Sequence, residues 1–149
     1  MTSITPDVSN VTQNAVDYLR QRLRRELGKR STNSFCKIYL PHHFTIPWGE
    51  HHEDLFACFD GSPSNVTFVG SLSGGKRICR AEPRKFGKTS IVGTAHPIRF
   101  LAYRTKQFIL MIGESAAGAE SNLQSIIDEV ENNDLLLHDF PHLAPAIDA

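Results

Sequence analysis

Four stretches of the chain place apolar residues at the spacing of an amphipathic helix. Because an α-helix has 3.6 residues per turn, residues three and four positions apart share one face. In the first stretch these residues are Val16, Leu19, Leu23 and Leu27. The pattern predicts helices over about residues 11–29, 50–59, 88–104 and 115–131.

Two local signals refine these helices. Ser115 stands where a side-chain oxygen can accept a hydrogen bond from the first turn of the last helix. Asn132 and Asn133 mark the end of that helix. Pro97 lies inside the third helix and predicts a kink or break near His96, because proline lacks a backbone donor and crowds the preceding turn.

Short apolar runs between these helices predict strands. The clearest is residues 106–113, which contains five consecutive apolar residues, as expected for a strand buried on both faces. Residues 35–39, 66–69 and 77–81 are shorter candidates. From residue 77 to 131 the order is strand, loop, helix, strand, helix, which favours a parallel sheet covered by helices.

The loop between the strand at 77–81 and the helix at 88–104 resembles a phosphate-binding loop. The usual pattern is G-x-x-x-x-G-K-[ST] between a strand and a helix. Residues 82–89 keep Gly87, Lys88 and Thr89 but have Glu82 in place of the first glycine. Residues 70–77 match the pattern equally well by letter and differ only in Arg77, which replaces the hydroxyl residue.

The surroundings distinguish the two matches. A phosphate needs backbone N–H groups at a helix N-terminus, a lysine, and a hydroxyl for Mg²⁺. A helix of three to four turns follows Lys88 and Thr89, whereas only a short piece ending at Pro83 follows Arg77. The site is therefore predicted at residues 82–89. Arg84 and Lys85 offset the charge that Glu82 brings near the phosphates.

Composition and charge are those of a soluble protein with two unlike parts. The chain has 149 residues, no apolar stretch of about 20 residues and no secretory signal pattern. Its three cysteines are widely spaced, as expected for thiols in a reducing compartment. All 16 Lys and Arg lie in residues 1–113, and half of the 16 acids lie in residues 114–149. A basic front part suits a polyanion such as a nucleotide or a nucleic acid.

Two further groups of residues have both a functional and a structural interpretation. The pairs His42-His43 and His51-His52, together with Cys36 and Cys58, suggest zinc. Their spacings fit no common zinc framework, which favours solvated or packed histidines. The arginine-rich helix at residues 20–30 suits DNA phosphates or a neighbouring subunit, and a solvated helix face is the alternative.

The phosphate loop also resembles that of phage terminase large subunits, the ATPases that package viral DNA. Their loop reads Pro-Arg-x-x-Gly-Lys-Ser/Thr, and residues 83–89 have this pattern. Residues 39–56 are similar to the segment before the ATPase core in that family, and residues 108–115 to the strand after the P-loop helix. Residues 120–140 are similar to the stretch that follows. The resemblance covers about residues 20–143 in the same order.

The resemblance implies ATP and Mg²⁺ as ligands. Lys88 would hold the β and γ phosphates and Thr89 would bind Mg²⁺. Arg84 matches the arginine that senses the γ-phosphate and couples it to DNA movement, so Arg84 and Lys88 are the predicted catalytic residues. Trp48 and His52 are expected near the adenine. The full predicted nucleotide-binding set is Glu82, Pro83, Arg84, Lys85, Phe86, Gly87, Lys88 and Thr89.

One element of the family pattern has no match. In terminases the next strand ends in Asp-Glu, where the Asp orders Mg²⁺ and the Glu activates water. Glu114 and residues 135–139 imitate parts of this pattern without completing it. We therefore expect an N-terminal fragment of a terminase large subunit, truncated before the Walker B strand and the nuclease domain. It would bind ATP and lack the full hydrolytic machinery.

The expected fold is α/β: a partial, ASCE-type P-loop NTPase with a parallel sheet flanked by helices. Residues 1–34 would form an N-terminal helical segment and residues 35–149 the first part of the ATPase domain. Expected partners are double-stranded viral DNA, the portal, the small terminase subunit and other copies in the full-length motor. The expected location is the host cytoplasm, without a membrane. The alternatives are a nucleic-acid-binding or assembly module with a degenerate loop, or another P-loop ATPase such as a helicase-like protein.

Overall fold

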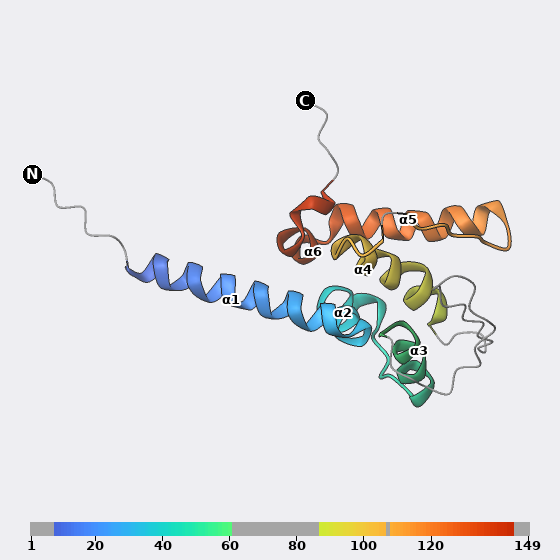
Figure 1. The fold of residues 1–149 in the computed structure, drawn as a ribbon. Helices are drawn as coiled ribbons and strands as arrows, with labels where there is room; N and C mark the ends of the chain where they lie inside the picture. The colour runs from blue at the N-terminus through green and yellow to red at the C-terminus, as the bar shows by residue number, and fades with distance from the viewer. Residues whose placement is uncertain (1–7, 61–86, 107, 145–149) are drawn as a thin grey trace, which may run out of the picture.

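The computed structural model describes residues 8–60, 87–106 and 108–144, and every regular element in these ranges is a helix (Figure 1). None of these helices is long and apolar enough to cross a membrane. In chain order the elements are α1 (Val8–Arg30), α2 (Thr32–Tyr39), η1 (Pro41–His43), α3 (Glu50–Asp60), η2 (Thr89–Ala95), α4 (His96–Ala102), α5 (Ala116–Asn132), α6 (Asp134–Asp139) and η3 (Pro141–Leu143).

The predicted α/β fold with a parallel sheet is wrong, since the described ranges contain no strand. Residues 35–39 lie in α2 instead of a strand. Residues 108–112 follow a non-helical path without a pairing strand, and Phe108, Leu110 and Ile112 are exposed. The predicted strands at 66–69 and 77–81 lie outside the described residues.

The four predicted helices are all present. They correspond to α1, α3, the continuous pair η2 and α4, and α5. Ser115 caps α5 as predicted, because its side chain accepts a hydrogen bond from the N–H of Gly118 at 3.2 Å. The predicted boundary between residues 34 and 35 lies inside α2.

The core forms where α2 packs against α1, α3, η2 and α4. Ser31 caps α2 by accepting a hydrogen bond from the N–H of Ser34. The helix then buries Phe35, Cys36 and Tyr39 on one face. The Tyr39 ring lies 5.4 Å from that of Phe140, close enough for an edge-on aromatic contact. Segments from both ends of the chain therefore meet in one core.

Only the C-terminal part of α1 joins this core. Figure 1 shows α1 extending away from the other helices toward its N-terminus. In this part of the helix, the side-chain amide of Gln21 donates a hydrogen bond to the carbonyl of His138 at 3.0 Å. The predicted apolar face of α1 is exposed along its length, at Val16, Leu19, Leu23 and Leu27.

Two arginines tie α1 to the rest of the fold. Arg24 makes a two-pronged ion pair with the buried Asp139 of α6, at 2.6 and 2.7 Å. Arg99 of α4 donates to the backbone carbonyls of Gly28 and Lys29 at 3.0 and 2.7 Å, and its guanidinium lies 3.1 Å from Asp60. Arg99 thus satisfies acceptors at the C-terminal end of α1, where the last carbonyls have no partner within the helix.

Candidate functional site

Gly87, Lys88 and Thr89 stand at the beginning of a helix, as predicted. Gly87 has a φ of 66°, a left-handed conformation that favours glycine. Its carbonyl accepts the first helical hydrogen bond, from the N–H of Ile91 at 2.9 Å. Residues 82–86 lie outside the described residues, so the roles of Glu82, Pro83, Arg84, Lys85 and Phe86 stay predictions.

The helix that begins here is wider than an α-helix in its first part. η2 is a π-helix, and the N–H of His96 bonds to the carbonyl of Ile91, five residues earlier. Pro97 follows immediately, within the first turn of α4. Since a proline ring crowds the carbonyl four residues before it, a local widening of the helix relieves the clash. Near His96, where the sequence predicts a kink or break, the helix continues and its geometry changes from π to α. Such π segments occur frequently at functional sites.

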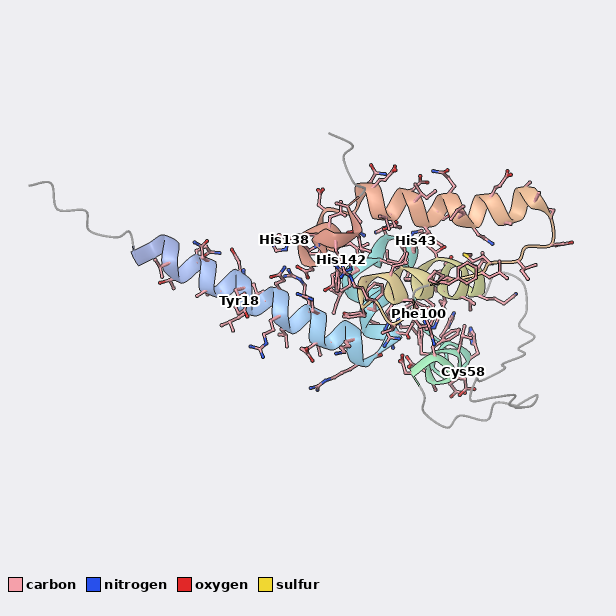
Figure 2. All side chains as sticks on the ribbon, turned by 45° about the horizontal axis from the view of Figure 1, so that its top comes forward. Tyr18, His43, Cys58, Phe100, His138 and His142 are labelled. Atoms are coloured by element: carbon pink, nitrogen blue, oxygen red, sulfur yellow. The ribbon has the colours of Figure 1, made fainter. Side chains whose placement is uncertain are left out.

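A cavity of about 550 Å³ opens beside this helix start. Lys88 and Thr89 lie on its wall, so a cation and a hydroxyl border the same space. The aromatic rings of Phe59 and Phe100 contribute apolar surface, and Figure 2 shows Phe100 on α4 among the central helices. Residues 109–113 and Asn122 of α5 complete the lining. The cavity therefore combines polar groups suited to phosphate with apolar surface suited to an aromatic ring.

His96 is a buried polar group in the lining of this cavity. Its ring lies between those of Phe59 and Phe100, with centroids 4.0 and 4.2 Å away. Burial and the nearby charge of Arg99 lower the pKa of His96 to about 4, so the ring is neutral at physiological pH. Its Nδ1 atom has no hydrogen-bond partner within the described part of the chain. Because buried polar atoms are normally paired, Nδ1 of His96 is a candidate contact for a ligand in the cavity.

The predicted adenine-side residues have different surroundings. A Cβ built on Gly87 would lie 3.9 Å from Nε2 of His52, so His52 is close to the helix start. Trp48 packs against Phe44 and Phe56, with ring centroids 4.8 and 5.0 Å away, and does not line the cavity. The adenine-side roles of Trp48 and His52 stay predictions, and the sequence did not identify the aromatic residues that line the cavity. The spacing of His96 and Phe100, four residues apart on a predicted helix, was the available signal.

A second cavity, of about 620 Å³, is strongly basic. Arg22, Arg25 and Lys29 of α1 line it together with Arg104. Arg104 follows α4 and has a φ of 51°, which is uncommon for a residue other than glycine. Arg104, which is distant in sequence, thus extends the basic face predicted on residues 20–30.

The zinc ligands suggested by the sequence do not come together as a set. Cys36 and Cys58 are buried thiols, and burial raises the pKa of Cys36 to about 12. Neither belongs to a group of three potential metal ligands in the described ranges. His42 and His43 instead meet Glu129, a residue that the sequence gave no reason to include.

No family model, curated protein or solved structure matches this chain. The resemblance to terminase large subunits therefore rests only on the sequence patterns of residues 39–56, 83–89, 108–115 and 120–140.

Proposed function

We propose that the chain binds ATP with Mg²⁺ at the helix start formed by Gly87, Lys88 and Thr89, as the nucleotide-binding part of a DNA-packaging motor of the terminase large subunit kind. The observation that carries the proposal is that Gly87, Lys88 and Thr89 stand at the beginning of a helix, where Lys88 and Thr89 border a cavity. The link to DNA packaging depends on the sequence resemblance alone.

Phosphate binding at this place needs a helix N-terminus and does not need a sheet. Backbone N–H groups and the helix dipole favour a negative charge there. Lys88 supplies a positive charge and Thr89 a hydroxyl ligand for Mg²⁺, the two groups that a P-loop uses. The positive φ of Gly87 turns the chain into the helix at the point where a phosphate approaches the backbone.

The aromatic part of the cavity suits the base of the nucleotide. Phe59 and Phe100 line the cavity, and the neutral ring of His96, which also lines it, lies 4.0 and 4.2 Å from their ring centroids. A nucleobase has both an apolar face and polar edges, which match this combination of groups. The base would then lie against Phe59 of α3 and Phe100 of α4, residues that line the cavity, whereas Trp48 is not part of this lining.

The test is the Mg²⁺ dependence of ATP binding in two variants of Thr89. Calorimetric titration of the wild-type chain with ATP should show tighter binding with Mg²⁺ than with EDTA. Thr89→Ala should lose this difference, because alanine has no hydroxyl for the metal, and Thr89→Ser should keep it. If Thr89→Ala retains the full Mg²⁺ effect, Thr89 is not the metal ligand and the proposed site is wrong.

The basic cavity supports a second candidate, a nucleic-acid-binding module. Arg22, Arg25, Lys29 and Arg104 border one space, and such a cluster suits the phosphates of DNA. Binding of a double-stranded DNA should then weaken steeply with salt, and each lost phosphate contact should reduce the salt slope by about one. Arg22→Ala and Arg25→Ala test this expectation. DNA binding that ATP does not affect would favour the second candidate over the first.

A further inference from the structure

Three side chains from distant parts of the chain converge on one point at the surface of the helical core. Nε2 of His42 and Nε2 of His43 lie 2.5 and 2.8 Å from the same oxygen, Oε1 of Glu129. The histidines belong to η1 and the glutamate to α5, more than 80 residues away in sequence. Figure 2 shows His43 beside the ribbon of α5. All three ligand atoms lie within 4.8 Å of one another.

A hydrogen bond to the second carboxylate oxygen orients Glu129. Its second oxygen, Oε2, accepts a hydrogen bond from the side-chain amide of Asn133 at 2.9 Å. The same amide donates to the backbone carbonyl of Tyr39 at 2.7 Å, and the Asn133 oxygen caps α6 by accepting from Leu136. The carboxylate is therefore oriented by a residue fixed to α2, α5 and α6 together. Metal sites commonly position their ligands through such outer hydrogen bonds.

Burial of the carboxylate fits the role of a charged ligand. The Glu129 side chain is only 10% exposed. Burial alone would raise the pKa of Glu129, but hydrogen bonds from His42 and Asn133 outweigh it and hold the pKa below its usual value. Glu129 is consequently an anion at neutral pH, whereas the histidines are more open to solvent.

We propose that His42, His43 and Glu129 form a binding site for a divalent transition metal ion, with Zn²⁺ the best match. Two imidazoles and one carboxylate are the donor set of zinc sites that keep one position open. Bond lengths of about 2.0–2.2 Å separate ligand atoms by roughly 3.3 Å in a tetrahedron, so each histidine nitrogen needs to move away from Oε1 of Glu129 by less than about 1 Å.

Two of the three proposed ligands, His42 and Glu129, border a cavity. A hollow of about 350 Å³ is bordered by His42 and Glu129, and also by Asn132 and Asp134. This space admits water or a small ligand as the fourth donor. His42 and His43 donate hydrogen bonds to Glu129 through Nε2, the atom that would bind the metal. When the metal binds, each ring would therefore have to move this proton to Nδ1 or release it.

A purely structural role for the three residues makes a different prediction. In that case the histidines only attach η1 to α5 through hydrogen bonds to Glu129, and added metal has no specific effect. Glu129→Gln separates the two roles, because glutamine still accepts a hydrogen bond through its carbonyl oxygen but lacks the anionic charge that a metal ligand supplies.

The experiment is a titration of the untagged chain with Zn²⁺, competed against a chelator of known affinity. We expect one equivalent to bind, with affinity reduced at least about tenfold in His42→Asn, His43→Asn and Glu129→Gln, since even outer-shell changes at metal sites cost 10–100-fold. His142→Asn is the matched control. His142 follows a proline in η3 as His42 does in η1, but it lies outside the cluster, so its variant should bind zinc like the wild type.

A measurement on the wild-type chain avoids any dependence on the folding of the variants. In an NMR spectrum of the histidine ring protons, Zn²⁺ should shift the signals of His42 and His43 and leave that of His142 in place. Absence of a one-equivalent site would overturn the proposal, and so would zinc affinity that the three variants leave unchanged or shifts that appear at other histidines instead.

Discussion

Removing the arginine that faces Asp139 should destabilise the fold more than any ordinary surface change. Asp139 is 0% exposed and accepts hydrogen bonds from Arg24, from the Tyr39 hydroxyl at 2.9 Å, and from Nδ1 of His138 at 2.8 Å. Burial alone would raise the pKa of Asp139, but these hydrogen bonds, that of Arg24 first, hold it below its usual value. The carboxylate is therefore charged and buried, and Arg24 supplies its compensating charge.

The magnitude follows from the burial of the pair. Removing one partner of a buried ion pair costs about 3–5 kcal/mol, because it leaves an uncompensated charge. Since the Arg24 side chain is 26% exposed, water can partly replace it. We therefore expect Arg24→Ala to lower the free energy of unfolding by about 3 kcal/mol, the lower end of that range. That loss is a large fraction of the typical 5–15 kcal/mol for a whole domain.

The assay is urea unfolding followed by circular dichroism, with Arg20→Ala as the matched control on the same helix. Arg20 pairs with Asp17 at 3.5 Å, and both side chains are more than half exposed. Exposed pairs contribute about 1 kcal/mol or less, so the control should change little. If Arg24→Ala costs no more than Arg20→Ala, the buried pair does not stabilise the packing of α1 on α6.

Three further predictions concern the same packing. Because the folded pKa of Asp139 lies below its unfolded value, its stabilising contribution is present above about pH 4 and is lost as the pH falls through the folded pKa. In Asp139→Asn, the free energy of unfolding measured with urea should therefore fall less as the pH is lowered than in the wild type. An equal fall in both proteins would contradict this. Arg99→Ala should lower the free energy of unfolding by about 2–3 kcal/mol, because Asp60 loses its ion-pair partner and the carbonyls of Gly28 and Lys29 lose a charged donor. A loss smaller than the roughly 1 kcal/mol of an exposed pair would refute this. Gly28→Ala should lower the melting temperature, since the added Cβ would lie 2.7 Å from the Tyr103 hydroxyl. A rise, as helix propensity alone would give, would contradict the close approach.

The sequence predicted helices well because their signal is local. The periodic apolar positions located α3 and α5, and Ser115 was identified as a cap from its chemistry alone. The end of the last helix was also predicted, since Asn133 follows α5 and caps α6. Each of these features depends on residues within about one turn of each other.

The sheet was predicted wrongly because a short apolar run does not specify its partners. Residues 108–112 have the composition of a buried strand, yet Phe108 and Ile112 are exposed while Met111 packs against the core. Residues 135–139, which imitate a metal-binding strand, form part of α6 with Leu136 and Asp139 buried. A strand exists only where another segment pairs with it, and the sequence pattern does not contain that information.

The candidate sites also differ in whether their residues are close together or far apart in the sequence. Gly87, Lys88 and Thr89 are adjacent in sequence, so a local motif was sufficient to place them at a helix start. The proposed metal site joins His42 and Glu129 across 87 residues, and neither spacing nor composition connects them. Contacts of this kind depend on how the helices pack, which explains why they were not predicted.

The most direct test of nucleotide binding at the helix start is a calorimetric titration of ATP with Mg²⁺ into the wild-type chain, Lys88→Ala and Lys106→Ala. Lys88 borders the cavity, whereas Lys106 is an exposed lysine outside it and serves as the control. Binding should be lost in Lys88→Ala and retained in Lys106→Ala. Equal ATP affinity in the wild type and Lys88→Ala, or no binding to the wild type, would contradict the proposed site.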